Sequence, residues 1–145
     1  MTRNVGFYTN TALRLLLGIT FMMHGIFKLE WGYGGLTEWL HSQGFPLAEL
    51  FGYVLPWIEL LGGILVLIGA GTRYVAALFS LILLVALLKV KLGAGFISSS
   101  ATGYEFELLL LAVSVHVAAT APNSLKDVWV SLFERGNNGH VQSNQ

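Results

Sequence analysis

Residues 50–70, LFGYVLPWIELLGGILVLIGA, decide the fold of this chain. An α-helix needs about 20 apolar residues to cross the hydrocarbon core of a bilayer, and this run has that length with Glu59 near its middle. A charge in hydrocarbon costs several kcal/mol, so such a residue usually faces a partner or a cavity. The run therefore predicts a membrane-spanning helix with a polar site on one of its faces.

Three further apolar runs of similar length follow the same pattern, at about residues 10–29, 74–92 and 103–121. Charged residues lie inside these runs or at their rims, namely Arg14, Lys89 and Glu107. Residues 1–135 are therefore predicted to form a single all-α domain, an integral membrane four-helix bundle. The fourth run is the shortest, because its uninterrupted part spans only residues 108–121, which is about 21 Å at helical rise.

The connection between the first two runs carries a helical pattern of its own. Leu36, Trp39 and Leu40 are spaced at i, i+3 and i+4, and Gly44 follows as a helix stop. This pattern predicts a short amphipathic helix that lies on the membrane and covers one mouth of the bundle. The short Gly71 turn makes the second and third runs an antiparallel hairpin.

The C-terminal part of the chain is predicted to form an interfacial helix and a tail. Ser124 with Asp127 matches a capping box, and an apolar stripe follows it within residues 124–135. The polar residues 136–145 are predicted to be disordered.

Composition excludes several classes of function. Hydrophobic residues make up 54% of the 145-residue chain, charged residues make up 11%, and the formal net charge is zero. A chain with no net positive charge lacks the basic character of a nucleic-acid-binding protein. There is no cysteine, so the chain itself carries no disulfide and no thiol relay.

Four spans place both termini on one side of the cell membrane, as a multi-pass protein. The basic residues on the side of the termini are Arg3, Arg14, Arg73, Lys126 and Arg135. Those on the other side are Lys28, Lys89 and Lys91. The excess favours cytoplasmic termini under the positive-inside rule.

The charges of the first two spans share faces with glycine. Arg14 and Lys28 lie on one face of the first span together with Gly25, and Glu59 lies beside Gly63. Small residues let membrane helices approach closely, so the two spans are expected to pack there. Arg14 is placed about 8 Å from the depth of Glu59, and the two are predicted to form a pair, which is either part of a site or a structural tie.

The charges of the outer half predict a ligand site. The expected polar cluster consists of Arg14, His24, Lys28, Glu59, Lys89, Glu105 and Glu107. A competing interpretation treats Lys28, Lys91 and Glu30 as anchors that extend to the membrane surface. His116 is expected to be a hydrogen-bonded packing residue, whereas His24 is balanced between packing and binding.

No metal site and no intrinsic cofactor are predicted. His24 and His116 differ in depth by about 12 Å, too much for opposite axial ligands of one haem. Outside the Glu105–Glu107 region, no pair of metal-binding side chains has helical i, i+4 spacing.

These residues resemble the DoxX family of small bacterial and archaeal membrane proteins. The matching motifs run in family order over about residues 10–130 and include Arg14 to Lys28-Leu29, Gly44-Phe45-Pro46, Glu59 to Gly62-Gly63, Thr72-Arg73, Gly103 with Glu105, and Ser124 to Asp127. The resemblance implies a four-helix membrane fold, the label of oxidoreductase, and a link to quinone-dependent redox chemistry and redox stress. The chain departs from many relatives at Lys89-Val90-Lys91, where those relatives carry a histidine.

The leading functional hypothesis is a membrane-embedded component of a quinone-linked redox or redox-stress-protection system. A quinone suits the spans, since its tail is apolar and its carbonyl oxygens need donors such as Arg14, His24 or Lys89, with Glu59 or Glu107 as proton acceptors. Such a role requires a bound diffusible cofactor or a redox partner protein. The alternatives are a non-catalytic assembly or stress-protection protein whose buried charges are structural, and a proton-coupled carrier. A homo-oligomer remains open.

Overall fold

The computed structural model describes residues 2–97 and 103–121. The capping box at Ser124 and Asp127, the C-terminal interfacial helix, the tail at 136–145 and the loop around Ser98–Ser100 lie outside the described residues. Every regular element within the described part is helical, in agreement with the all-α prediction.

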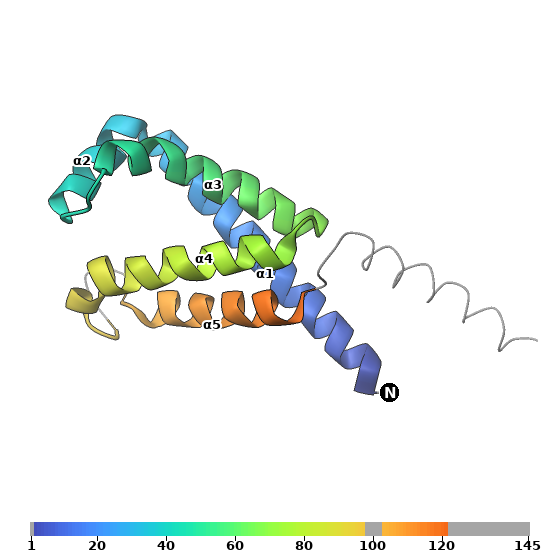
Figure 1. Ribbon diagram of the computed structural model, residues 1–145. Coiled ribbons are helices and arrows are strands. Elements are labelled where there is room, and N and C mark those ends of the chain that lie inside the picture. Colours follow the sequence, from blue (N-terminus) through green and yellow to red (C-terminus); the bar gives the residue numbers. More distant parts are fainter. Residues whose placement is uncertain (1, 98–102, 122–145) are drawn as a thin grey trace, which may run out of the picture.

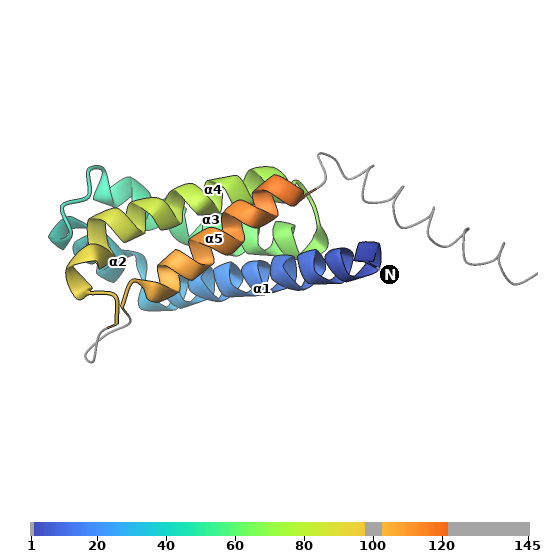
Figure 2. The same cartoon turned by 90° about the horizontal axis from the view of Figure 1, so that it is seen from below.

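The described helices form two layers. Their bounds are α1 Thr2–Trp31, α2 Tyr33–Ser42, α3 Ala48–Ile68, α4 Thr72–Ala86, a π-helical turn η1 Leu87–Lys91, a 3₁₀ turn η2 Leu92–Ala94 and α5 Glu105–Thr120. Figure 1 shows α1 paired with α3 in one layer and α4 paired with α5 in the other. Figure 2 shows the same layers from below, with the start of α1 and the end of α5 at the same end of the molecule.

Three of the helices are long and apolar enough to cross a membrane: residues 5–31 of α1, all of α3, and α4 with η1. The fourth predicted run forms α5, which has 16 residues and is shorter than the expected 103–121. Large apolar side chains such as Leu16, Ile68 and Leu81 are exposed on the outer surfaces of these helices, as expected for helices in contact with lipid.

Glycine brings α1 and α3 into close contact. A Cβ atom added to Gly25 would lie 2.5 Å from the backbone nitrogen of Leu60, and one added to Gly63 would lie 2.5 Å from that of Met22. Any larger residue would force the two backbones apart. The predicted close packing of the first two spans is therefore confirmed.

The core between the layers is aromatic and aliphatic. Phe21 of α1 stacks on Phe79 of α4, with ring centroids 3.5 Å apart and planes 4° from parallel. Leu17, Val66 and Leu83 are buried around this pair. The stack holds the α1–α3 layer against α4, because separating the rings would expose both to a cavity.

A small polar contact joins α4 to α5. The hydroxyls of Ser80 and Ser114 both donate to the Ala76 carbonyl, at 2.9 and 2.8 Å, and lie 3.1 Å from each other. In an apolar setting such hydrogen bonds fix the register of two helices, because an unpaired hydroxyl would be left without water.

The predicted amphipathic helix between the first two spans is confirmed as α2. Leu36 and Leu40 are buried against Ala48, and the helix ends before Gly44, whose φ is 68°. Tyr33 of α2 stacks on Tyr53 of α3 at 4.7 Å and accepts a hydrogen bond from Trp57. Thus α2 is fixed to the start of α3, and its position on a membrane surface remains a prediction.

The hairpin between α3 and α4 is also confirmed. Gly69 and Gly71 have φ values of 83° and 59°, a conformation that residues with a Cβ seldom adopt. The Gly69 amide bonds back to the Val66 carbonyl and so ends α3. The tight turn makes α3 and α4 antiparallel, and they diverge toward the α2 end of the molecule (Figure 1).

Candidate functional site

A buried ion pair ties α1 to α3. Lys28 Nζ contacts both carboxylate oxygens of Glu59. The Glu59 side chain is 2% exposed and the Lys28 side chain 20% exposed. A buried carboxylate needs a cation and hydrogen bonds to offset its desolvation, and the lysine supplies both.

The predicted pair between Arg14 and Glu59 is wrong. Arg14 Nη1 instead donates to the Val66 carbonyl at 3.4 Å, near the C-terminal end of α3. The reason is the register of the two helices, since Gly25 lies opposite Leu60 and Gly18 lies opposite Leu67. This register puts the Glu59 carboxylate at the level of Lys28, while Arg14 reaches the Val66 carbonyl in the last turn of α3, where a cation is favourable.

Lys28 is consequently not the surface anchor of the competing interpretation. Its side chain turns along α1 toward the neighbouring helix, so its ammonium is held inside the protein by Glu59. The Gly25 contact makes this possible, because it brings the α3 backbone within reach of a lysine one turn away.

A second ion pair lies on the other layer, between Lys91 of η1 and Glu107 of α5. The Lys91 Nζ to Glu107 Oε1 distance is 3.1 Å, and the two side chains are 25% and 13% exposed. Lys89, the predicted site residue, is exposed. Sequence reasoning therefore chose the wrong lysine of this segment, and treated Lys91 as an anchor.

The π-helical turn η1 explains which lysine enters. The buried face of α4 continues through Leu83 and Leu87. In a regular α-helix each further step of four residues drifts by about 40°, which would turn Lys91 roughly 80° away from Leu83. The wider turn of a π-helix removes much of that drift and keeps Lys91 on the buried face, while Lys89 lies about half a turn away.

His24 lies between the two ion pairs. Its ring is 6.3 Å, centroid to centroid, from the rings of both Phe21 and Phe106. It is within Coulombic range of Lys28, Lys91 and Glu107. One imidazole from α1 thus faces charges contributed by both layers.

Two carboxylate oxygens of α5 can accept further hydrogen bonds. The Oε2 atoms of Glu105 and Glu107 are buried, and neither has a hydrogen-bond partner within residues 2–97 and 103–121. Glu105 packs close to Gly103 at the start of α5. A buried carboxylate oxygen of this kind can accept a proton or a hydrogen bond from a guest molecule.

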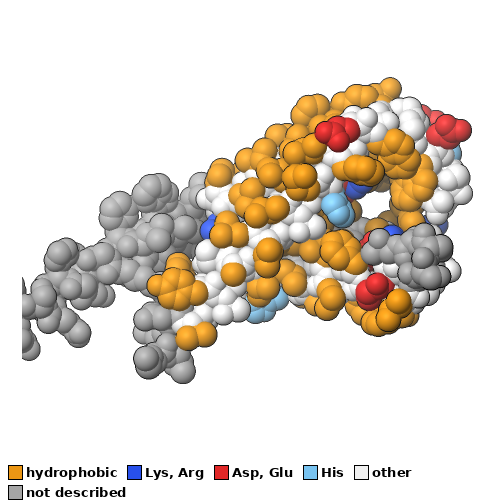
Figure 3. All heavy atoms as spheres, turned by 180° about the vertical axis from the view of Figure 1, so that it is seen from behind, with side chains coloured by type: hydrophobic (Ala, Val, Ile, Leu, Met, Phe, Trp, Pro, Cys, Tyr) orange, Lys and Arg blue, Asp and Glu red, His pale blue; other side chains and the backbone are white. Residues whose placement is uncertain are grey.

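The outer ends of the two layers leave an opening between them. Figure 3 shows it as a gap through the molecule near the α2 end, with basic, histidine and acidic side chains gathered at its rim and apolar side chains around them. The combination of an apolar wall with a few convergent polar groups is typical of small-molecule sites.

Of the seven predicted site residues, the structure brings four together: His24, Lys28, Glu59 and Glu107. Glu105 lies next to this group at the start of α5. Arg14 lies at the opposite end of α3, and Lys89 is turned outward. The missed member is Lys91, whose place on the buried face depends on the π-helical turn η1 and not on regular helical spacing from Leu83.

His116 has the role expected for it. Its Nε2 atom lies 2.7 Å from Oδ1 of Asn10, and so links α5 to α1 far from the ion pairs. This histidine is a packing residue, as predicted.

The chain is a small helical protein whose apolar helices enclose paired charges. These features are typical of membrane-associated proteins. The chain belongs to the DoxX family, whose sequence model matches residues 9–92. It is also similar to "Putative oxidoreductase CatD" of Bacillus subtilis (strain 168), at 39% identity over 132 residues, which cover 90% of this chain and 92% of that protein. No solved structure matches the chain.

Proposed function

We propose that the protein is a membrane-embedded component of a quinone-linked redox or redox-stress-protection system, and that the opening at the α2 end holds a quinone-like molecule. One observation carries this proposal. The His24 ring lies 6.3 Å from each of two aromatic rings and within Coulombic range of Lys28 from one layer and of Lys91 and Glu107 from the other. The name of the relative, "Putative oxidoreductase CatD", favours redox chemistry for this site.

The residues around the opening suit a quinone ring. Lys28 and His24 are donors for the two carbonyl oxygens, and Phe106 offers an aromatic face beside them. When bound, a quinone supplies reversible two-electron and two-proton chemistry. The chain's part is to orient the ring, to exclude lipid, and to accept protons at the buried Oε2 atoms of Glu105 and Glu107.

The membrane arrangement belongs to the same proposal. We infer a multi-pass four-helix bundle in the cell membrane, in which α5 is the fourth crossing and both termini are cytoplasmic. The 16 residues of α5 span about 24 Å at helical rise, so Glu105 and Glu107 lie at the membrane edge, where Lys91 neutralises Glu107.

A redox role requires a further partner. The chain has no cysteine, so electrons must reach a bound quinone from a second protein or a diffusible donor. We propose a redox partner protein for this step, and a homo-oligomer remains compatible with the exposed apolar helix faces.

The alternative function is a non-catalytic assembly, stress-protection or small-molecule-handling protein. Its supporting observation is that three of the buried cations are already paired: Lys28 with Glu59, Lys91 with Glu107, and Arg14 with a backbone carbonyl. Charges satisfied in this way can serve to fix helix register alone.

The deciding experiment is extraction and mass spectrometry of the small molecules that remain with the detergent-purified protein. The proposal predicts a quinone at a stoichiometric level, reduced at least tenfold in Lys28→Met. Lys89→Met is the matched control, because it removes a neighbouring but exposed lysine. Lipid alone in all three proteins would favour the non-catalytic alternative.

A further inference from the structure

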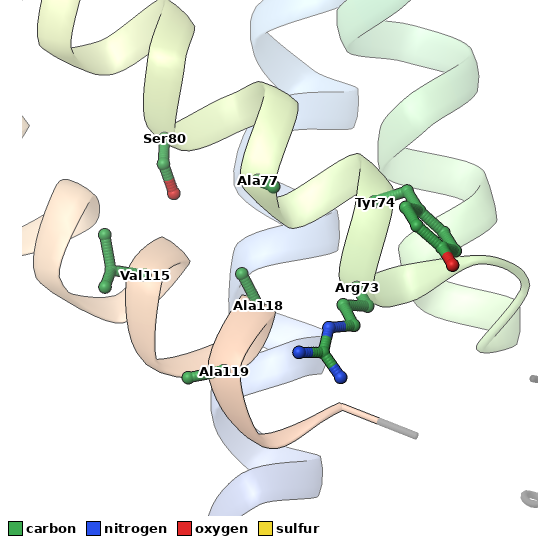
Figure 4. A pocket seen from close by; sticks show the side chains of 7 residues that line it. All are labelled: Arg73, Tyr74, Ala77, Ser80, Val115, Ala118 and Ala119. Carbon is green, nitrogen blue, oxygen red and sulfur yellow. The ribbon is translucent and has the colours of Figure 1, made fainter. Parts of the chain in front are cut away.

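A second cavity lies at the other end of the molecule, on the outer face of the α4–α5 layer. It is a groove of about 440 Å³ lined by Arg73, Tyr74, Ala77, Ser80, Val115, Ala118 and Ala119. Figure 4 shows that these side chains come from residues 73–80 of α4 and residues 115–119 of α5. It contains none of the residues of the ion-pair site.

The floor of the groove is apolar because its side chains are small or already satisfied. Ala77 of α4 and Ala118 and Ala119 of α5 line the groove, and their small side chains leave a channel between the two helices unfilled (Figure 4). The Ser80 hydroxyl is used within the protein, in its hydrogen bond to the Ala76 carbonyl. A hydrocarbon chain can therefore contact the rest of this surface without leaving a buried polar group unpaired.

The mouth of the groove carries a cation. The Arg73 guanidinium lies at the end nearest the α3–α4 turn, beside the exposed ring of Tyr74 (Figure 4). Arg73 is the second residue of the apolar segment Thr72–Lys91, so it lies where a spanning helix meets the headgroup region. A guanidinium has five N–H donors, enough to hold a phosphate in addition to a partner within the protein.

Size decides what can occupy the groove. A helix from another protein is about 10 Å across and would need a much longer interface than one groove of this volume. An extended acyl chain fits a narrow channel with small walls. Its headgroup would then lie at Arg73, which selects for negative charge.

We propose that this groove is a binding site for an anionic phospholipid, with one acyl chain along Ala77 and Ala118 and the phosphate held by Arg73. The inference is independent of the proposed quinone site. It gives the α4–α5 layer a lipid that seals the gap between the helices on the side of the termini.

The test is native mass spectrometry of the full chain in detergent with added phosphatidylglycerol or phosphatidylcholine. The wild-type protein should retain one phosphatidylglycerol in preference to phosphatidylcholine. Arg73→Gln should lower that affinity about tenfold, as expected for the loss of one charge-assisted contact. Lys89→Gln, which removes an exposed cation at the other end, should leave the affinity unchanged.

Filling the channel tests the acyl-chain part. Ala77→Leu or, if that variant unfolds, Ala119→Leu should weaken the binding of both lipids, whereas Ala12→Leu adds the same bulk at an exposed position of α1 and should not. Inorganic phosphate should not displace the lipid. Equal lipid retention in the Arg73 and groove variants would overturn the proposal, and a dimer lost on filling the groove would assign it to a second copy of the chain.

Discussion

Lys28 and Glu59 form the contact on which the rest of the site depends. A glutamate that is 2% exposed in an apolar protein must be neutralised, and the lysine ammonium does so with both carboxylate oxygens. The pair also joins α1 to α3 at the level of the His24 ring. The pair therefore holds the two helices together, and a ligand at this site would compete with Glu59 for the Lys28 ammonium.

Removing one member of this pair should destabilise the protein. Lys28→Met or Glu59→Gln should each lower thermal stability in detergent, because breaking a buried pair typically costs about 3–5 kcal/mol. The double variant Lys28→Met with Glu59→Gln should lose clearly less than the sum, with a coupling of about 1 kcal/mol or more. Strictly additive losses would mean that the two side chains do not pair.

Arg14 provides the matched control for that cycle. Because Arg14 bonds to the Val66 carbonyl and not to Glu59, Arg14→Met and Glu59→Gln should be additive within about 0.5 kcal/mol. Thermal unfolding of the two single variants and the double variant measures this. A coupling between Arg14 and Glu59 as strong as that between Lys28 and Glu59 would show that Arg14 pairs with Glu59, as expected from the sequence.

At the scale of elements, η1 decides which lysine joins the site. Its wider turn accommodates one additional residue at the end of α4 while keeping Lys91 beneath Leu87. Single-turn π-helices of this kind are frequent at functional sites. Here the turn directs the Lys91 ammonium toward Glu107 in the first turn of α5.

Changing the length of η1 should expose this role. Deleting Leu88, which is 58% exposed, should leave a regular α-helix with Lys91 still facing Glu107. Inserting one alanine after Leu88 should rotate Lys91 by about 100° and separate the pair. Lys91→Met should then lower thermal stability in the deletion background but have no effect in the insertion background. The reverse pattern would mean that η1 does not position Lys91 against Glu107.

The elements were more predictable than their contacts. Periodicity and glycine placement in the sequence predicted α2 and the α3–α4 turn, because these depend on neighbours within a few residues. Small residues beside the charges on both spans predicted the close approach of α1 to α3. The partner of Glu59 was not predictable in this way. It depends on a register in which Gly25 lies opposite Leu60, and a shift of one helical turn exchanges Lys28 for another residue.

At the scale of the whole molecule, the length of α5 decides the topology. Three segments are long and apolar enough to cross a membrane, and α5 has 16 residues. Its contacts with α4 through the buried Ser114 and with α1 through His116 favour a fourth crossing within the same assembly. An even number of crossings places the two ends of the chain on one side.

Reporter fusions test that topology. A fusion after Arg135 should report a cytoplasmic location, and one within Ser98–Ser100 an extracytoplasmic location, because α5 lies between the two positions. Both reporters on the same side would show that α5 does not cross. An exchange of the two sides would reverse the orientation and leave the number of crossings intact.

Photolabelling tests whether the opening between the layers binds a quinone through Lys28 and His24. A ring-substituted azidoquinone should label peptides that contain His24, Lys28 or Phe106, saturate near one equivalent, and be displaced by unlabelled quinone. Lys28→Met should abolish this labelling, and Lys89→Met should preserve it. Labelling that does not saturate, or that maps to the Arg73 groove in place of these peptides, would contradict the account.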